Sequence, residues 1–147
     1  MQYLTPFHLA TYLLAILSLF HTIFGVFFPD YPPHALIVLD SMKTVKFNFL
    51  GTSCTFNKFF LGNGLFATVL FTLSAFLTWQ LAEAKPSERE TLRPIAWALF
   101  FSFVVVTGLT WAFFFVAPLA FSMLITGSMG CGCWTIYRVD GGGKKEA

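Results

Sequence analysis

The residues of this sequence best suited to acid–base chemistry are one histidine, one aspartate and two lysines. His21 lies in the second half of the apolar segment Leu9–Phe28, one turn after Ser18. An imidazole at that depth needs a hydrogen-bond partner, because an unpaired polar group in lipid is costly. Two interpretations stay open: a structural hydrogen bond to a neighbouring helix, or a proton donor or acceptor beside a buried ligand.

A second group consists of Asp40, Lys43 and Lys46, which we expect on one face of a short helix, with Asp40 and Lys43 able to pair. The alternative is an amphipathic segment whose charges simply face water. If the group does chemistry, Asp40 is the carboxylate best placed to activate water, and Lys46 or Lys58 could polarise a substrate oxygen. The candidate catalytic residues are therefore His21, Asp40, Lys46 and Lys58.

The candidate substrate-binding residues are Asn57, Asn63 and Trp111. Asn57 and Lys58 open the second long apolar segment, and Asn63 follows between two glycines. Structural interpretations stay open as well. Asn57 could cap the helix, Lys58 could reach the membrane interface, and Trp111 could belong to an interfacial aromatic belt. Gly62 and Gly64, on either side of Asn63, could allow close helix approach. The functional hypothesis requires five residues to converge at one mouth of a helical bundle, namely His21, Asp40, Lys46, Asn57 and Lys58.

Cysteine spacing and charge argue against several other functions. Cys131 and Cys133 form C-x-C rather than the C-x-x-C redox spacing, so we expect the cysteines to be packing residues, with no metal and no cofactor. The net charge of +2 is too small and scattered for nucleic-acid binding. The expected partners are a lipophilic small molecule and membrane lipid, and a homo-oligomer stays open.

Apolar composition determines which elements must position these residues. The chain has 147 residues, of which only 11% are charged, against about 25% in soluble domains. The run Ile95–Ile136 contains no Asp, Glu, Lys, Arg or His, and one span takes about 20 residues. It therefore predicts two spans joined by a tight turn. With Leu9–Phe28 and Phe59–Leu81, the sequence predicts an all-α bundle of four transmembrane helices with a long, partly helical first loop.

The predicted boundaries follow from prolines, glycines and charges. We expect helices over 5–28, 57–84, 93–111 and 117–137, with the break between the last two at Gly108 or Pro118. The connection 29–56 is mostly apolar and should contain a short helix at the membrane interface or in the bundle mouth. The segment Glu83–Arg93 should be a solvated loop. One four-helix domain over 1–138 and a disordered polar tail over 139–147 complete the prediction.

The distribution of basic residues predicts the orientation of the chain. Six lie on the side of the termini, namely Lys85, Arg89, Arg93, Arg138, Lys144 and Lys145, and three on the other side, namely Lys43, Lys46 and Lys58. We therefore expect a multi-pass protein with both termini in the cytoplasm. The endoplasmic reticulum and the plasma membrane are both open as its location.

Several short motifs occur in a defined order along the chain. They are Ser18-x-x-His21-Thr22-x-x-Gly25, Met42-x-x-Val45-x-Phe47, Phe59-x-Leu61-Gly62-x-Gly64-Leu65, Trp79-Gln80-Leu81 and Trp111-x-Phe113-Phe114-x-x-x-Pro118. This pattern resembles a family of small, poorly characterised four-helix membrane proteins with a DoxX-like layout, which implies no particular activity. In size, span number and polar first loop, the chain also resembles small membrane hydrolases of fungal polyketide clusters, which implies epoxide opening.

Two hypotheses from different classes follow. The first is a membrane-bound hydrolase or cyclase that acts on a lipophilic small molecule in secondary metabolism, by epoxide hydrolysis or acid–base-promoted cyclisation. The second is a non-enzymatic membrane scaffold or subunit that could bind lipid, in which His21 makes a helix–helix hydrogen bond. A transporter is a weaker third hypothesis, because four helices leave little room for alternating access unless the chain dimerises.

Overall fold

Four long apolar helices dominate the structure, a computed structural model that describes residues 5–29 and 31–142. The segments long and apolar enough to cross a membrane are Pro6–Phe27, Phe56–Glu83, Pro86–Phe113 and Val116–Ile136. Spans of this kind form because a helix satisfies every backbone polar group within the segment itself. The chain is thus a multi-pass integral membrane protein, and the four predicted spans are confirmed.

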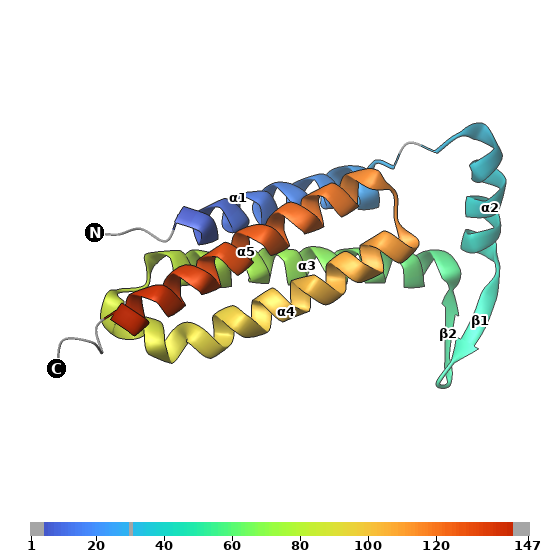
Figure 1. Cartoon of the computed structure of the whole chain (residues 1–147). Helices are drawn as coiled ribbons and strands as arrows, with labels where there is room; N and C mark the ends of the chain where they lie inside the picture. The colour runs from blue at the N-terminus through green and yellow to red at the C-terminus, as the bar shows by residue number, and fades with distance from the viewer. Residues whose placement is uncertain (1–4, 30, 143–147) are drawn as a thin grey trace. The chain divides into compact units, whose positions relative to one another are not determined.

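The described chain folds as two compact units, divided after Leu17 and again after Phe71. The four-helix unit contains the start of α1 (Thr5–Phe20), the end of α3 (Phe56–Glu83), the short η2 (Pro86–Glu88), α4 (Arg89–Phe113) and α5 (Val116–Gly142). Within it, α4 and α5 lie side by side and antiparallel, joined by a tight turn (Figure 1). One core cluster draws on all four helices: Phe7, Leu81, Ala82, Ala96, Cys133 and Ile136. The predicted all-α bundle is therefore confirmed.

Two glycines allow neighbouring helices to approach α5 closely. A Cβ on Gly132 would lie 2.6 Å from the ring of Phe7 on α1, and a Cβ on Gly130 would lie 3.0 Å from the ring of Phe100 on α4. Small residues commonly play this role in membrane bundles, where backbones must come close to gain packing energy. The glycine-rich stretch of α5 is therefore the surface on which the two phenylalanines pack.

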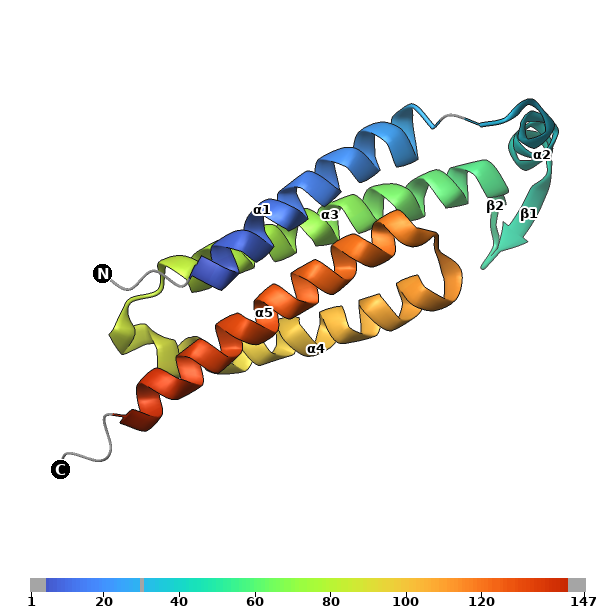
Figure 2. The same cartoon turned by 45° about the horizontal axis from the view of Figure 1, so that its top comes forward.

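The hairpin unit, residues 18–71, holds the long first connection and the helix ends beside it. Here α1 continues as the π-helix η1 (His21–Phe27), whose end is marked by a hydrogen bond of 2.7 Å from Phe28 N–H to the carbonyl of Ile23. The predicted short helix is confirmed as α2 (Pro33–Thr44), with its proline in the first turn. Figures 1 and 2 show α2 lying crosswise to the start of α3.

A β-hairpin that we did not predict follows α2. Strands β1 (Lys46–Phe49) and β2 (Thr52–Thr55) pair antiparallel across a two-residue turn. Both turn residues have positive φ, +49° at Leu50 and +84° at Gly51, as the tight hairpin turns with matching twist require. The connection is therefore a folded helix–hairpin segment rather than a plain loop.

The observed boundaries differ from the predicted ones at the later helices. We expected the third helix to begin at Arg93, but α4 begins at Arg89. Pro94 therefore lies inside the helix, where it removes the backbone bond to Glu90, one turn from the helix start. The break falls at Phe114 and Phe115 rather than at either predicted position. Of the predicted tail, residues 139–142 form the end of α5, and 143–147 lie outside the described residues.

Candidate functional site

The imidazole of His21 is bound to the backbone of the opposite helix. Its Nε2 lies 3.1 Å from the carbonyl oxygen of Gly64 on α3. Because a carbonyl oxygen only accepts, Nε2 carries the hydrogen and donates. The ring edge also meets the face of Phe71, with centroids 5.7 Å apart. This is the geometry of the structural interpretation, a hydrogen bond between two helices.

Close contact between η1 and α3 makes this bond possible. A Cβ on Gly64 would lie 2.9 Å from Val26, whereas a Cβ on Gly62 would meet nothing within 4 Å. Of the two glycines expected to allow close approach, Gly64 does so. One turn away, Thr22 Oγ1 lies 2.9 Å from Thr68 Oγ1, and Ser18 Oγ donates to the carbonyl of Thr68 at 3.3 Å. The polar groups around His21 therefore join the two helices.

Threonine pairs perform the same task within the four-helix unit. Thr11 Oγ1 on α1 donates to Thr78 Oγ1 on α3 over 3.0 Å, and both residues are buried. On the other side, Thr107 of α4 and Thr126 of α5 lie 2.9 Å apart at their hydroxyl oxygens. Such bonds stabilise helix pairs in membranes by about 0.6–2 kcal/mol each. Polar residues in the spans thus hold helices together.

The charged candidates around Asp40 do not form the predicted cluster. Asp40 and Lys43 are exposed on α2, and the carboxylate of Asp40 makes no hydrogen bond or ion pair with any residue that the structure describes. Helix α2 ends at Thr44, so Lys46 lies in β1 and cannot share a helical face with the other two. The predicted common face is therefore wrong, because the helix ends two residues before Lys46, the third charge.

The remaining candidate residues also make separate contacts and do not meet at one site. Thr55, rather than Asn57, caps α3, since its Oγ1 accepts from the backbone N–H of Lys58 at 3.3 Å. Lys58 and Asn63 are exposed, and Asn57 is half-buried. Trp111 belongs to the four-helix unit and is 75% exposed near the end of α4.

A hollow of about 260 Å³ lies beside α2, and its walls contain none of these candidates. They are Tyr31, Ala35, Val38, Leu39, Met42 and Phe60. In the part of the chain that the structure describes, no hydrogen bond or ion pair joins His21, Asp40, Lys46 and Lys58. Side-chain contacts therefore do not assemble these four residues into a catalytic site.

Two polar residues outside the predicted site, His8 and Arg89, make contacts or are buried in ways that we did not expect. His8 Nε2 lies 3.0 Å from Glu83 Oε1, and the His8 ring meets Trp79 edge-on at 5.7 Å. Arg89, expected in a solvated loop, is only 3% exposed at the start of α4. The sequence contained a signal for the pair of His8 and Glu83. His8 lies near the start of one span and Glu83 at the end of another, and antiparallel spans bring such ends together.

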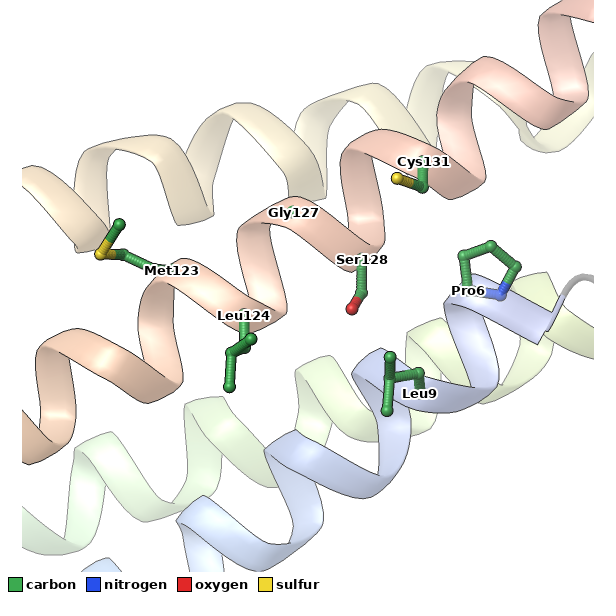
Figure 3. Close-up of a pocket in the computed structure, with 7 residues that line it drawn as sticks. All are labelled: Pro6, Leu9, Met123, Leu124, Gly127, Ser128 and Cys131. Carbon is green, nitrogen blue, oxygen red and sulfur yellow. The ribbon is translucent and has the colours of Figure 1, made fainter.

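An open apolar groove lies between α1 and α5 in the four-helix unit (Figure 3). It has a volume of about 450 Å³, and its walls are Pro6, Leu9, Met123, Leu124, Gly127, Ser128 and Cys131. At Gly127 an added Cβ would meet nothing within 4 Å, so the groove is open there because a side chain is missing.

Among the described residues of the groove wall, Ser128 alone carries a hydroxyl. Figure 3 shows its oxygen pointing from α5 toward α1. Several helical hydroxyls bond a carbonyl on their own helix, such as Ser122 to Leu119 at 2.9 Å, whereas that of Ser128 bonds no residue among those described. The thiol of Cys131 is the only ionisable group in the wall, and no base accepts from it within the described residues.

Comparisons of this chain with protein-family models, curated protein sequences and solved structures found no match. The resemblances to small four-helix membrane proteins and to fungal membrane hydrolases therefore stay predictions that rest on short motifs, size and layout.

Proposed function

We propose that this protein is a non-enzymatic, lipid-binding membrane subunit that holds one lipophilic chain in the groove between α1 and α5. The observation that carries the proposal is the composition of the groove wall, which is apolar apart from one hydroxyl and one thiol. Its volume of about 450 Å³ falls within the roughly 300–1,000 Å³ typical of small-molecule sites. A wall of this kind fits an aliphatic chain.

Binding is favoured over turnover because the groove lacks an acid–base pair. General acid–base catalysis needs a titratable group within hydrogen-bond reach of the reacting atom. The wall supplies only Cys131, which has no base beside it among the described residues. Ser128 can instead donate its hydrogen to an ester or ketone oxygen of the bound molecule, which would fix the position of the chain along the groove.

Native mass spectrometry of the protein released from a mild detergent tests this proposal. Wild type should retain one lipid adduct, and Gly127→Leu should lose it, because a leucine side chain fills the open part of the groove. Gly108→Leu is the matched control, since Gly108 is also an exposed helical glycine with nothing within 4 Å of its Cβ position. Equal adducts in the two variants would contradict the proposal.

The epoxide-opening hypothesis stays a prediction, and the contacts of the described residues do not favour it. It requires an acid near the substrate oxygen and a base beside the attacking water, and the exposed Asp40 makes no hydrogen bond with His21 among the described residues. Wild-type membranes that hydrolyse a lipophilic epoxide, with loss of this activity in Asp40→Asn, would restore it.

We further propose that both termini face the cytoplasm, in the endoplasmic reticulum or the plasma membrane. The support is the excess of basic residues on the side of the termini, six against three. A glycosylation acceptor site carried on a long flexible linker inserted beside Ser87, in the connection between α3 and α4, should remain unmodified. The same linker and site inserted at Gly51 should be glycosylated, because the linker carries the acceptor away from the membrane surface. The reverse pattern would contradict this orientation.

A further inference from the structure

The β-hairpin has one apolar and one polar face. Paired residues of an antiparallel ladder share a face, and successive residues alternate. The register pairs Phe47 with Cys54 and Phe49 with Thr52. The opposite face carries Lys46, Asn48, Ser53 and Thr55. This amphipathic pattern is typical of a hairpin that covers an apolar surface.

The apolar face is directed toward the start of span α3. The ring of Phe47 lies 4.5 Å from that of Phe56 and 6.1 Å from that of Phe59, measured between centroids, and Phe49 approaches Phe59 at 6.4 Å. Phe59 lies about one turn deeper into the span than Phe56. The hairpin therefore turns its phenylalanines toward the depth of the membrane.

The hairpin and α2 both lie crosswise to the start of α3 (Figures 1 and 2). Since α3 crosses the bilayer, a segment crosswise to its first turn lies along the membrane surface. No linker separates the hairpin from α3, because β2 ends at Thr55 and α3 begins at Phe56. This geometry keeps the hairpin at the interface.

The tip of the hairpin is apolar and in an unusual conformation. Leu50 is 92% exposed, and its φ of +49° lies in the left-handed region that glycine and asparagine normally occupy. A backbone outlier of this kind is grounds for a functional hypothesis. Phe49, which is 58% exposed, extends the same apolar tip.

The charges of this segment complement lipid phosphates. Between residues 31 and 58, Asp40 is the single acidic residue, and there are three lysines, Lys43, Lys46 and Lys58. All three lysines are exposed. Lysines above an apolar face are the arrangement of segments that lie in the plane of a membrane interface.

We propose that the hairpin and α2 form a platform that lies flat on the surface of the same bilayer. In this platform the tip at Leu50 and Phe49 enters the boundary between headgroups and acyl chains, and the lysines contact lipid phosphates. The platform lies entirely within the hairpin unit and does not depend on lipid binding in the groove between α1 and α5.

An environment-sensitive probe tests the platform in the full-length protein. Dansylalanine is introduced by stop-codon suppression at Leu50 or, as the matched control, at Ser53, an exposed position on the polar face. Each protein is reconstituted into phosphatidylcholine vesicles with or without brominated acyl chains. We expect the emission of the probe at position 50 to shift to shorter wavelength and to lose most of its intensity with brominated lipid. The probe at position 53 should keep both its wavelength and its intensity.

Every other outcome overturns the platform. A water-like, unquenched probe at position 50 would place the tip in solvent. A blue-shifted but unquenched probe would place it against protein, and equal quenching at positions 50 and 53 would remove the distinction between the faces. If the position 50 protein aggregates, the same comparison is made with Thr52, which shares the face of Phe49.

Discussion

Replacing Gly132 by alanine should push α1 away from α5. The new Cβ would lie 2.6 Å from two carbons of the Phe7 ring and 2.8 Å from a third, whereas carbon atoms in contact prefer about 3.5–4.0 Å. The ring cannot swing into solvent, because Phe7 is completely buried in the core cluster. Either the ring or the whole of α1 must therefore move by about 1 Å to restore that spacing.

The size of the effect follows from two opposing contributions. Overpacking a well-packed core costs about 1–3 kcal/mol, and replacing glycine by alanine within a helix gains up to about 1 kcal/mol. The net loss for Gly132→Ala is about 0–3 kcal/mol, so the variant needs a matched reference. Gly108→Ala supplies it, since nothing lies within 4 Å of its Cβ position. The difference between the two variants should be about 1–3 kcal/mol in favour of Gly108→Ala.

Thermal or denaturant unfolding of the purified protein in one mild detergent measures this difference. A double-mutant cycle with Phe7→Leu identifies its cause, because the shorter side chain should relieve the clash and make Gly132→Ala nearly harmless in that background. Equal stability of the Gly132→Ala and Gly108→Ala proteins would refute the packing argument. So would a cycle in which the two effects simply add.

Three further predictions concern the polar residues. His21→Ala should lower stability by about 0.6–2 kcal/mol through loss of the bond to Gly64, whereas alanine at the exposed His34 should leave the unfolding midpoint unchanged. Thr126→Val should destabilise the α4–α5 pair by about 1 kcal/mol in the same assay, because its hydroxyl bonds across that interface. Asp40→Asn should change neither the unfolding midpoint nor the turnover of a panel of lipophilic epoxides by membranes that contain the protein, measured by mass spectrometry of the products. Loss of epoxide turnover in this variant would favour the enzyme hypothesis.

The spans could be predicted because hydropathy alone determines them. The run Ile95–Ile136 has no charged residue over a length that two helices need, and no other local structure satisfies its backbone in lipid. The short helix α2 could be predicted from its proline start and apolar first turn. The exact break between α4 and α5 could not, because Phe114 and Phe115 carry no local turn signal.

The hairpin was missed although a weak signal existed. Lys46 to Phe49 alternate polar and apolar residues, and Gly51 follows in the turn. Four residues of alternation are also compatible with a continued amphipathic helix, and Leu50 is an unusual residue for a position with positive φ. The pattern therefore predicts a helix that continues through Lys46, with this lysine on the same face as Asp40.

A single sequence could not predict which neighbours the candidate residues contact. The depth of His21 in its span required a hydrogen-bond partner but did not identify it, since the carbonyl of Gly64 becomes available only when η1 approaches α3. Burial of Arg89 likewise depends on how α4 packs against its neighbours. Spacing along a helix determines which residues share a face but not which neighbour that face meets.

Labelling with a photoactivatable lipid tests the central claim most directly, namely that a lipid chain occupies the groove between α1 and α5. A phosphatidylcholine with a diazirine in its acyl chain is added to the protein in nanodiscs, illuminated, and the labelled peptides are mapped by mass spectrometry. The account predicts labelling concentrated at Leu9, Met123 and Leu124, and its loss in Gly127→Leu but not in Gly108→Leu. Labelling spread evenly over all lipid-facing surfaces, unchanged in Gly127→Leu, would contradict it.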